Sequence, residues 1–177
     1  AEQGIESLAF RDTLTGLNNR LALEETLPDV LSKAKDQGGT VALFYIDLDG
    51  LKDVNDSLGH RGGDALLMRA ADRMRESLKG DGWVFRIGGD EFVILMPHCE
   101  GRKSAETLAG SLLERIGSHY VITGNRVQIG ASIGISLFPG DADSPQEIWD
   151  KGDEAMYEAK HAGKNRSVFY RDIKTFR

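Results

Sequence analysis

The chain has 177 residues, of which 40% are hydrophobic and 28% are charged, and its formal net charge is −6. This length and composition are typical of one soluble globular domain with a substantial core. The negative charge disfavours long-range attraction to nucleic acid or to an anionic membrane, so neither is expected as a direct partner. The single cysteine, Cys99, excludes an internal disulfide framework and paired-cysteine zinc sites.

Two units are expected along the chain. Residues 1–10 are interpreted as an N-terminal linker or the end of a signalling helix, and residues 11–177 as the folded domain. No signal peptide is visible, and no apolar run approaches the roughly 20 residues needed to span a bilayer. We therefore expect a cytoplasmic domain, although the full-length protein can still be tethered to a membrane.

The first part of the domain predicts a turn, a helix and a buried strand. Residues 12–20 are rich in turn formers, and residues 27–34 carry apolar side chains at helical spacing. A pair of glycines at 38–39 ends this helix. Residues 40–46 (TVALFYI) are typical of a strand that is buried on both faces.

The middle of the domain predicts a loop, a helix, a hairpin and a second helix. Residues 47–63 are expected to be irregular, whereas residues 64–78 carry apolar side chains at helical spacing. Residues 83–96 contain two strand-forming runs that meet at a Gly-Gly-Asp-Glu junction. This junction is typical of a hairpin, because glycine reaches positive φ without steric cost. Residues 105–116 have the apolar stripe of another helix.

The last part predicts a small hairpin, a strand, a helix and a final strand. The small hairpin covers residues 120–128, with its turn at Gly124-Asn125. Residues 127–137 alternate between apolar and mostly small side chains, which favours a strand with one small-residue face. A capping box at residues 144–147 begins a helix that runs to about His161. Residues 167–170 predict the last strand.

The expected order is therefore αβαββα, a minor hairpin, and then βαβ. Because the strands of a hairpin pair antiparallel, the sheet must be at least partly antiparallel. The sequence thus predicts an α+β domain and excludes a doubly wound parallel fold.

Two acidic pairs stand beside the predicted strands. Asp47 and Asp49 would point to the same side of their strand, because successive side chains alternate faces. Asp90 and Glu91 follow the glycine pair of the hairpin. Each pair taken alone is equally consistent with a solvated strand end or an acidic turn. If neighbouring strands bring the two pairs together, they form an all-oxygen site suited to Mg²⁺ or Mn²⁺.

Other cation and nucleotide motifs are excluded. An EF-hand beginning at Asp47 would need an oxygen ligand and a glycine where Leu51 and Lys52 stand. The chain has neither a G-x-x-x-x-G-K-[ST] loop nor a G-x-S-x-G element.

Five further side chains have the chemistry to complete a nucleotide site. Lys52 follows the first acidic pair, where a triphosphate would approach, and Asn55 and Asp64 have the groups to read a guanine edge. Taken singly, each is better explained by structure: Asp64 as a helix N-cap, and Lys160 and Lys164 as cations at a helix C-terminus.

Five motifs occur in a fixed order in this chain: DTLTGLNNR at 12–20, DLDGLKDVND at 47–56, GHRGGD at 59–64, GGDEF at 88–92 and AKHAGKNR at 159–166. Together they resemble the GGDEF-domain diguanylate cyclases, over nearly the whole chain from Asp12 onward. The resemblance implies a fold like the nucleotide cyclase and polymerase palm, with a central, largely antiparallel sheet of about five strands surrounded by helices.

The resemblance also implies an activity. Two domains that each bind one GTP meet face to face as a homodimer, and each 3′-hydroxyl attacks the α-phosphate of the opposing GTP. The products are cyclic di-GMP and two pyrophosphates, and an upstream sensor domain is the expected controlling partner. The alternative is a catalytically silent GGDEF module that binds GTP and regulates an attached domain.

Residue roles follow from the same resemblance. Asp47, the Leu48 carbonyl and Asp90 are similar to the groups that bind the metal ions in this family. Glu91 matches a residue that ligates metal or deprotonates the attacking hydroxyl, and Lys52 joins it and Asp90 in the catalytic set.

Substrate contacts are carried over in the same way. The groups expected to contact the triphosphate are Lys52, Lys160, Lys164 and the backbone amides of Gly50 and Leu51. Asn55 and Asp64 match the guanine readers, and the retained Asp64 favours GTP as the substrate.

One departure from the family pattern concerns regulation. The family's feedback site is Arg-x-x-Asp, but this chain has Lys79-Gly80-Asp81-Gly82 in its place. Lys79 lacks the planar guanidinium fork, and Gly82 supplies no carboxylate. We therefore expect weak or absent product inhibition through this site.

Overall fold

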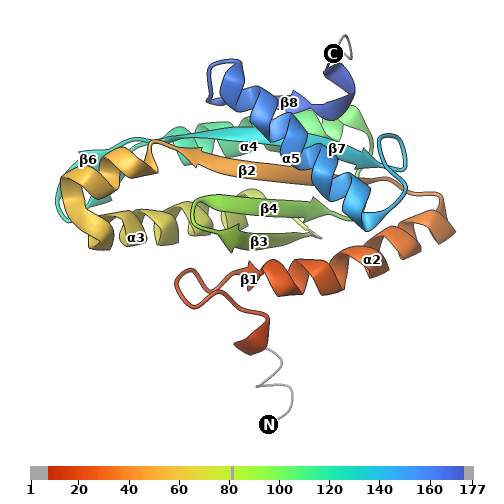
Figure 1. Cartoon of the computed structure of the whole chain (residues 1–177), viewed down its shortest axis with the longest axis horizontal. Coiled ribbons are helices and arrows are strands. Elements are labelled where there is room, and N and C mark those ends of the chain that lie inside the picture. Colours follow the sequence, from red (N-terminus) through yellow and green to blue (C-terminus); the bar gives the residue numbers. More distant parts are fainter. Residues whose placement is uncertain (1–7, 81, 174–177) are drawn as a thin grey trace.

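A central sheet with helices on both faces organises the chain in a computed structural model that describes residues 8–80 and 82–173 (Figure 1). The elements in chain order are β1 (Asn18–Asn19), α2 (Arg20–Gln37), β2 (Val41–Asp49), α3 (Leu51–Ser77), β3 (Trp83–Gly88), β4 (Glu91–Met96), α4 (Arg102–Gly117), β5 (Tyr120–Ile122), β6 (Asn125–Val127), β7 (Gly130–Phe138), α5 (Pro145–His161), β8 (Arg166–Phe169) and the 3₁₀ helix η1 (Tyr170–Asp172). The predicted order of helices and strands is confirmed.

The main sheet has the strand order β1-β3-β4-β2-β7-β8. The three inner pairings are antiparallel, while β1 and β8 join the two edges in parallel. β5 and β6 form a separate two-stranded hairpin. The α+β class, the largely antiparallel sheet and the small hairpin are thus as predicted. The sheet has six strands because the two-residue β1 adds an edge.

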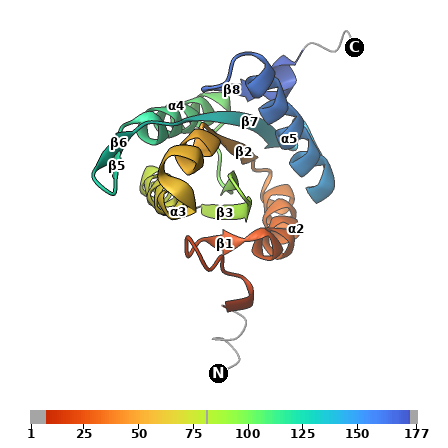
Figure 2. The ribbon, with the colours of Figure 1, turned by 60° about the vertical axis from the view of Figure 1, so that its left-hand side comes forward.

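Helices cover the sheet in two layers, which Figure 2 shows from the side. One hydrophobic cluster joins α3 and α4 to one face of the sheet, and a second joins α2 and α5 to the other face. β2 lies in the middle and is buried along almost its whole length. Its alternate side chains enter different clusters, so that Tyr45 belongs to the α2 and α5 side and Leu48 to the α3 and α4 side. Asp47 and Asp49 therefore continue the row that begins on the α5 side.

The prediction of an irregular segment over residues 47–63 is wrong. β2 continues to Asp49, and α3 begins at Leu51 and bends at Gly59, whose φ is 75° and ψ 174°. Leu51 and Val54 are buried in the core, so tertiary packing stabilises a turn of helix that weak apolar periodicity does not indicate. Asp64 consequently lies inside α3 and is not its N-cap.

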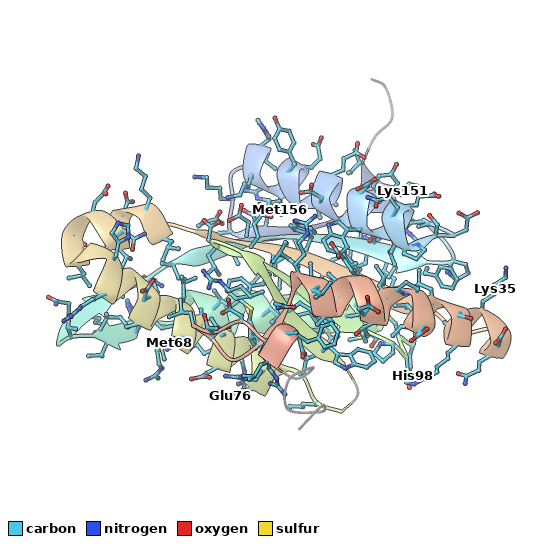
Figure 3. All side chains as sticks on the ribbon, turned by 60° about the horizontal axis from the view of Figure 1, so that its bottom comes forward. Lys35, Met68, Glu76, His98, Lys151 and Met156 are labelled. Carbon is cyan, nitrogen blue, oxygen red and sulfur yellow. The ribbon has the colours of Figure 1, made fainter. Side chains whose placement is uncertain are left out.

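The small-residue face of β7 has a packing role. It is buried against α5, and a Cβ added to Gly134 would lie 2.1 Å from the Met156 backbone nitrogen and 2.2 Å from the Gly152 oxygen. Met156, labelled in Figure 3, lies on the side of α5 that faces the sheet. The α5 backbone can approach the strand this closely only because Gly134 carries no side chain at the contact. This contact fixes the position of α5, which supplies Lys160 to the site described below.

Two local predictions are confirmed, one of them with a shift. Ser144 caps α5 by accepting a hydrogen bond from the Glu147 amide at 3.2 Å. The small hairpin turns at Thr123-Gly124, one residue before the predicted position, where both residues have positive φ.

Among residues 8–80 and 82–173, no helix is long and apolar enough to cross a bilayer. Most of the predicted N-terminal linker, residues 1–10, and Asp81 of the altered feedback motif lie outside the described residues.

Candidate active site

Pairing between β2 and β4 brings the two acidic segments together. Asp47 lies directly opposite Glu91 in the antiparallel ladder, and the Leu48 amide donates to the Asp90 carbonyl at 3.0 Å. Cα atoms paired across antiparallel strands are about 4.5–5.5 Å apart. The convergence that the sequence left conditional is therefore present in the fold.

Lys160 of α5 lies between the two carboxylates of β2. Its Nζ is 3.2 Å from Asp47 Oδ2 and 3.1 Å from Asp49 Oδ1. One ammonium group reaches both side chains because Asp47 and Asp49 point to the same side, as predicted. Lys160 offsets part of the negative charge that collects at this edge of the sheet.

Asp49 is fully engaged by protein groups. The Ser132 hydroxyl is 2.9–3.1 Å from its two oxygens, and the Asn165 amide donates to Oδ2 at 3.1 Å. Lys164 and Asn165 both have positive φ, which is uncommon for residues other than glycine. Asp49 thus ties the loop after α5, which carries Lys164, to the end of β2.

Asp47 is buried and, unlike Asp49, its hydrogen bonding is incomplete. Within the described residues, its Oδ1 is a buried side-chain oxygen without a hydrogen-bond partner. Burial, and then the charge of Asp90, raise the pKa of Asp47 to about 7, against the opposing effect of Lys160. A buried oxygen of this kind is stabilised by a proton or by a cation.

Glu91 is anchored to the core by Tyr45. The Tyr45 hydroxyl donates a hydrogen bond to Glu91 Oε1 at 2.7 Å. Burial and the Glu91 carboxylate raise the pKa of the Tyr45 hydroxyl above its ordinary range. On α5, burial raises the pKa of Asp153, and the charges of Glu91 and Asp150 add to this effect. Glu91 therefore lies among acids, with one hydroxyl donor beneath it.

The glycine turn of the hairpin is held by Arg86. Its Nε and Nη2 donate to the Gly89 carbonyl at 3.1 and 2.9 Å, and its Nη1 contacts both oxygens of Asp12 at 3.2 Å. Burial acts to raise the pKa of Asp12, but hydrogen bonds from Thr15 and the Arg86 charge outweigh it, so the pKa is lowered. The turn that presents Asp90 is thereby linked to the segment before β1.

The N-terminus of α3 lies directly after Asp49. Gly50 is the N-cap, with φ at 98°, and no side chain caps the first turn. The first amides of a helix lack intrahelical acceptors, so this end can bind an anion. Lys52 is exposed in this first turn.

The bend at Gly59 folds the start of α3 back onto its continuation. A Cβ added to Gly63 would lie 1.7 Å from Asn55 Oδ1, so the Asn55 amide packs against Gly63, the neighbour of Asp64. Residues eight positions apart in a straight helix would be about 12 Å apart along the axis. The bend therefore brings Asn55 against Gly63, the residue that precedes Asp64.

The predicted residues thus form two groups. Strand pairing, a backbone hydrogen bond and an ion pair bring together Asp47, Leu48, Asp90, Glu91 and Lys160. Lys52 and Lys164 are exposed, and neither forms an ion pair with these acids within the described residues.

No group of three or more His, Cys, Asp or Glu side chains is arranged as a metal site in the part of the chain that the structure describes. The convergent acids within residues 8–80 and 82–173 therefore do not form a complete side-chain cage for a metal by themselves.

Three participating residues were missed from the sequence: Tyr45, Ser132 and Asn165. Tyr45 stands two positions before Asp47 and so shares its face, which is a signal that alternation alone could have given. Ser132 and Asn165 contact Asp49 from 83 and 116 residues away, and no local pattern predicts such contacts.

Comparison with known proteins agrees with this geometry. The family described as "Diguanylate cyclase, GGDEF domain" matches residues 9–166. The chain belongs to the GGDEF family. Among solved structures, the GGDEF domain of TpbB (YfiN) from Pseudomonas aeruginosa superposes on it with a TM-score of 0.88 at 33% identity, covering 90% of this chain and 94% of that one. The GGDEF domain of DgcB from Caulobacter crescentus, in complex with c-di-GMP, gives a TM-score of 0.85 at 27% identity, covering 93% and 97%.

Its similar full-length relatives are bacterial and much longer. The bifunctional diguanylate cyclase/cyclic di-GMP phosphodiesterase MucR of Pseudomonas aeruginosa is 41% identical over 172 residues, which cover 96% of this GGDEF domain and 25% of MucR. The probable diguanylate cyclase DgcE of Escherichia coli is 37% identical over 163 residues, covering 92% and 15%. The cyclic di-GMP phosphodiesterase NbdA of Pseudomonas aeruginosa is 32% identical over 170 residues, covering 96% and 22%. The chain therefore spans a quarter or less of the length of these relatives.

Proposed function

We propose that this GGDEF domain is a diguanylate cyclase, which condenses two GTP into cyclic di-GMP with Mg²⁺ or Mn²⁺ as its cofactor. The observation that carries the proposal is the meeting of Asp47 with Asp90 and Glu91 beside the uncapped N-terminus of α3. Carboxylates and exposed helix amides at one edge suit a metal-bound triphosphate.

The acids fit a divalent ion. Asp47 Oδ1 is buried and has no hydrogen-bond partner in the part of the chain that the structure describes, which is the condition that a cation would relieve. We assign Asp47, the Leu48 carbonyl, Asp90 and Glu91 as its ligands. A bound Mg²⁺ would neutralise charge on the phosphoryl oxygens, as in other phosphoryl-transfer enzymes.

Positive groups surround the place where phosphates would lie. We assign the triphosphate contacts to Lys52, Lys160, Lys164 and the amides of Gly50 and Leu51. Lys160 already lies at the carboxylates, so it is within reach of a phosphate that approaches them. These groups would orient the α-phosphate and stabilise the charge of the leaving pyrophosphate.

Guanine recognition is assigned to Asn55 and Asp64. An Asp carboxylate accepts from guanine N1–H and N2–H₂, and an amide can serve the complementary groups. The bend at Gly59 supports this assignment because it places Asn55 against the residue that precedes Asp64.

The reaction requires two copies of the domain. Each 3′-hydroxyl gives its proton to Glu91 or to water, and its oxygen forms a bond to the α-phosphorus of the opposite GTP. The bond from that phosphorus to the bridging oxygen breaks, and pyrophosphate leaves with the electron pair. A homodimer with two-fold symmetry places the two half-sites face to face. In a longer protein, an upstream sensor domain would control this encounter.

Turnover tests the proposal directly. The purified chain is incubated with GTP and Mg²⁺ over a range of protein concentrations, and pyrophosphate and cyclic di-GMP are measured. We expect two pyrophosphates for each cyclic di-GMP, a rate that rises faster than linearly while monomers predominate, and no turnover when EDTA removes the metal.

The same assay decides the alternative of a silent regulatory module. A relative named as a phosphodiesterase, NbdA, matches almost the whole of this GGDEF domain, so the domain can accompany another named activity. GTP binding without turnover at every protein concentration would contradict the cyclase proposal and favour the silent module.

Substitution of Gly63 by alanine is expected to weaken GTP binding. The added Cβ would collide with Asn55 Oδ1, so the amide would be displaced from the base-reading position. Loss of about one hydrogen bond to the base corresponds to a KM for GTP that rises about tenfold, with kcat changed little. Gly110→Ala in α4 is the matched control, because its Cβ meets no atom within 4 Å. Steady-state kinetics in which both variants resemble the parent would contradict the role of Asn55.

A further inference from the structure

Tyr45 places a hydroxyl group beneath the acidic site. The side chain extends from the centre of β2 on the face covered by α5, and 4% of the residue is exposed. Its neighbours in the ladder are Val93 of β4 and Gly134 of β7. A ring that is packed in this way is held rigidly, so its hydroxyl occupies a defined position.

The Tyr45 hydroxyl donates a hydrogen bond to Glu91 Oε1 at 2.7 Å. This distance is typical of a strong hydrogen bond from a hydroxyl to a carboxylate. A carboxylate has two oxygens and about four acceptor positions, so this bond leaves Oε2 free to act as a ligand. The contact joins the rigid core to a side chain that the proposed function assigns to the metal.

The charges around Glu91 explain why such an anchor matters. Asp153 on α5 interacts repulsively with Glu91, and Asp47 and Asp90 also lie at this edge. The nearby cation, Lys160, forms ion pairs with Asp47 and Asp49. Within the described residues it forms no ion pair with Glu91. Without a donor beneath it, the Glu91 carboxylate would rotate away from its acidic neighbours toward water.

We infer that Tyr45 is a positioning residue for Glu91: its hydroxyl fixes one carboxylate oxygen so that the other is presented to the divalent cation. The inference rests on the proposed function for the identity of the ion. A group that orients a metal ligand typically affects metal affinity or activity by about 10- to 100-fold when it is removed.

Tyr45→Phe is the direct test, because it deletes only the hydroxyl. Binding of Mn²⁺ to the nucleotide-free protein is followed by electron paramagnetic resonance of the free ion, which requires no turnover. We expect the Kd for Mn²⁺ to rise about tenfold or more. In turnover assays we expect kcat to fall by a similar factor while the KM for GTP changes less than about twofold.

Tyr120→Phe is the matched control. Tyr120 is also a buried tyrosine, and its hydroxyl donates to the Ile116 carbonyl at 2.7 Å, in the small hairpin and away from the acids. Both variants lose one buried hydroxyl, so a general loss of stability would affect them alike. We expect Tyr120→Phe to bind Mn²⁺ as the parent does.

A double substitution shows whether Tyr45 acts through Glu91. In a Glu91→Gln background, Tyr45→Phe should cause little further loss of Mn²⁺ affinity, because the carboxylate it orients is already gone. Unchanged Mn²⁺ affinity in Tyr45→Phe, equal losses in Tyr45→Phe and Tyr120→Phe, or no Mn²⁺ binding by the parent would overturn the inference. A parent that binds Mn²⁺ but releases no pyrophosphate from GTP contradicts the proposed function alone, and the Kd values still decide the role of Tyr45.

Discussion

Asp47→Asn is expected to lower cyclase turnover by about 10³-fold, the scale of removing one group that stabilises charge in a transition state. The substitution keeps the shape of the side chain and removes its charge. Asp47 is central because it is buried at the junction of β2 and β4 and has an oxygen with no hydrogen-bond partner among residues 8–80 and 82–173. Initial rates of pyrophosphate release from GTP with Mg²⁺ give the measurement.

The same substitution is expected to stabilise the metal-free protein. The pKa of Asp47 is raised to about 7 by burial and by Asp90, from an ordinary value of 3.8. Between these two pH values the unfolded chain loses a proton that the folded chain retains, so the free energy of unfolding falls as pH rises. Asparagine removes this penalty. The full shift corresponds to about 4 kcal/mol, and loss of the ion pair with Lys160 offsets part of it. At pH 8 in EDTA we expect a net gain of about 2 kcal/mol, which disappears near pH 4.

Asp49→Asn is the contrasting control. Asp49 accepts hydrogen bonds from Ser132, Lys160 and the Asn165 amide, so loss of its charge weakens satisfied contacts. We expect this variant to be less stable than the parent at pH 8. Urea denaturation at pH 4 and pH 8 compares the three proteins. An Asp47→Asn protein that retains turnover, or that is destabilised like Asp49→Asn, would contradict the account of Asp47 as a buried carboxylate that Lys160 balances only in part and that a divalent cation completes.

Gly134→Ala is expected to have the largest effect on folding. The added Cβ would lie 2.1–2.2 Å from backbone atoms of α5, and backbone cannot move aside as a flexible side chain can. We expect the free energy of unfolding to fall by about 3 kcal/mol or more. Because α5 carries Lys160, its displacement should also reduce any remaining activity.

Gly39→Ala supplies the comparison for this change. Its Cβ would meet only the Ala34 carbonyl oxygen at 3.9 Å, which is an ordinary contact. We expect urea denaturation to show a change within about 0.5 kcal/mol for this variant. If Gly134→Ala were as stable as Gly39→Ala, the close approach of β7 and α5 would not determine the position of Lys160.

The sequence predicts the frame of this domain well because its main signals are local. The 40–46 run, the glycine junction of the hairpin and the Ser144 capping box each specify an element through neighbouring residues. The meeting of the two acidic pairs could be stated only as a condition, since strand order is not a local property. β2 pairs with β4 and β7, neither of which follows it directly in the chain.

What sequence reasoning missed depends on tertiary contacts. The first turns of α3 form because Leu51 and Val54 are buried, and Gly59 then redirects the chain by a positive φ. Lys160 reaches Asp49 across 111 residues, so its ion pairs have no signature within a motif. Alternation does place Tyr45 on the face of Asp47, but a tyrosine in a buried strand is most simply interpreted as core, and its contact with Glu91 depends on the pairing of β2 with β4.

Diffraction from crystals grown with Mn²⁺ and a GTP analogue that cannot release pyrophosphate tests the central claim most directly. The anomalous signal of Mn²⁺ locates the ion independently of the protein atoms. The account predicts a peak bonded to the carboxylates of both Asp47 and Asp90, with the analogue's phosphates beside it at the N-terminus of α3. A peak that contacts neither carboxylate, or an analogue bound elsewhere on the domain, would contradict it.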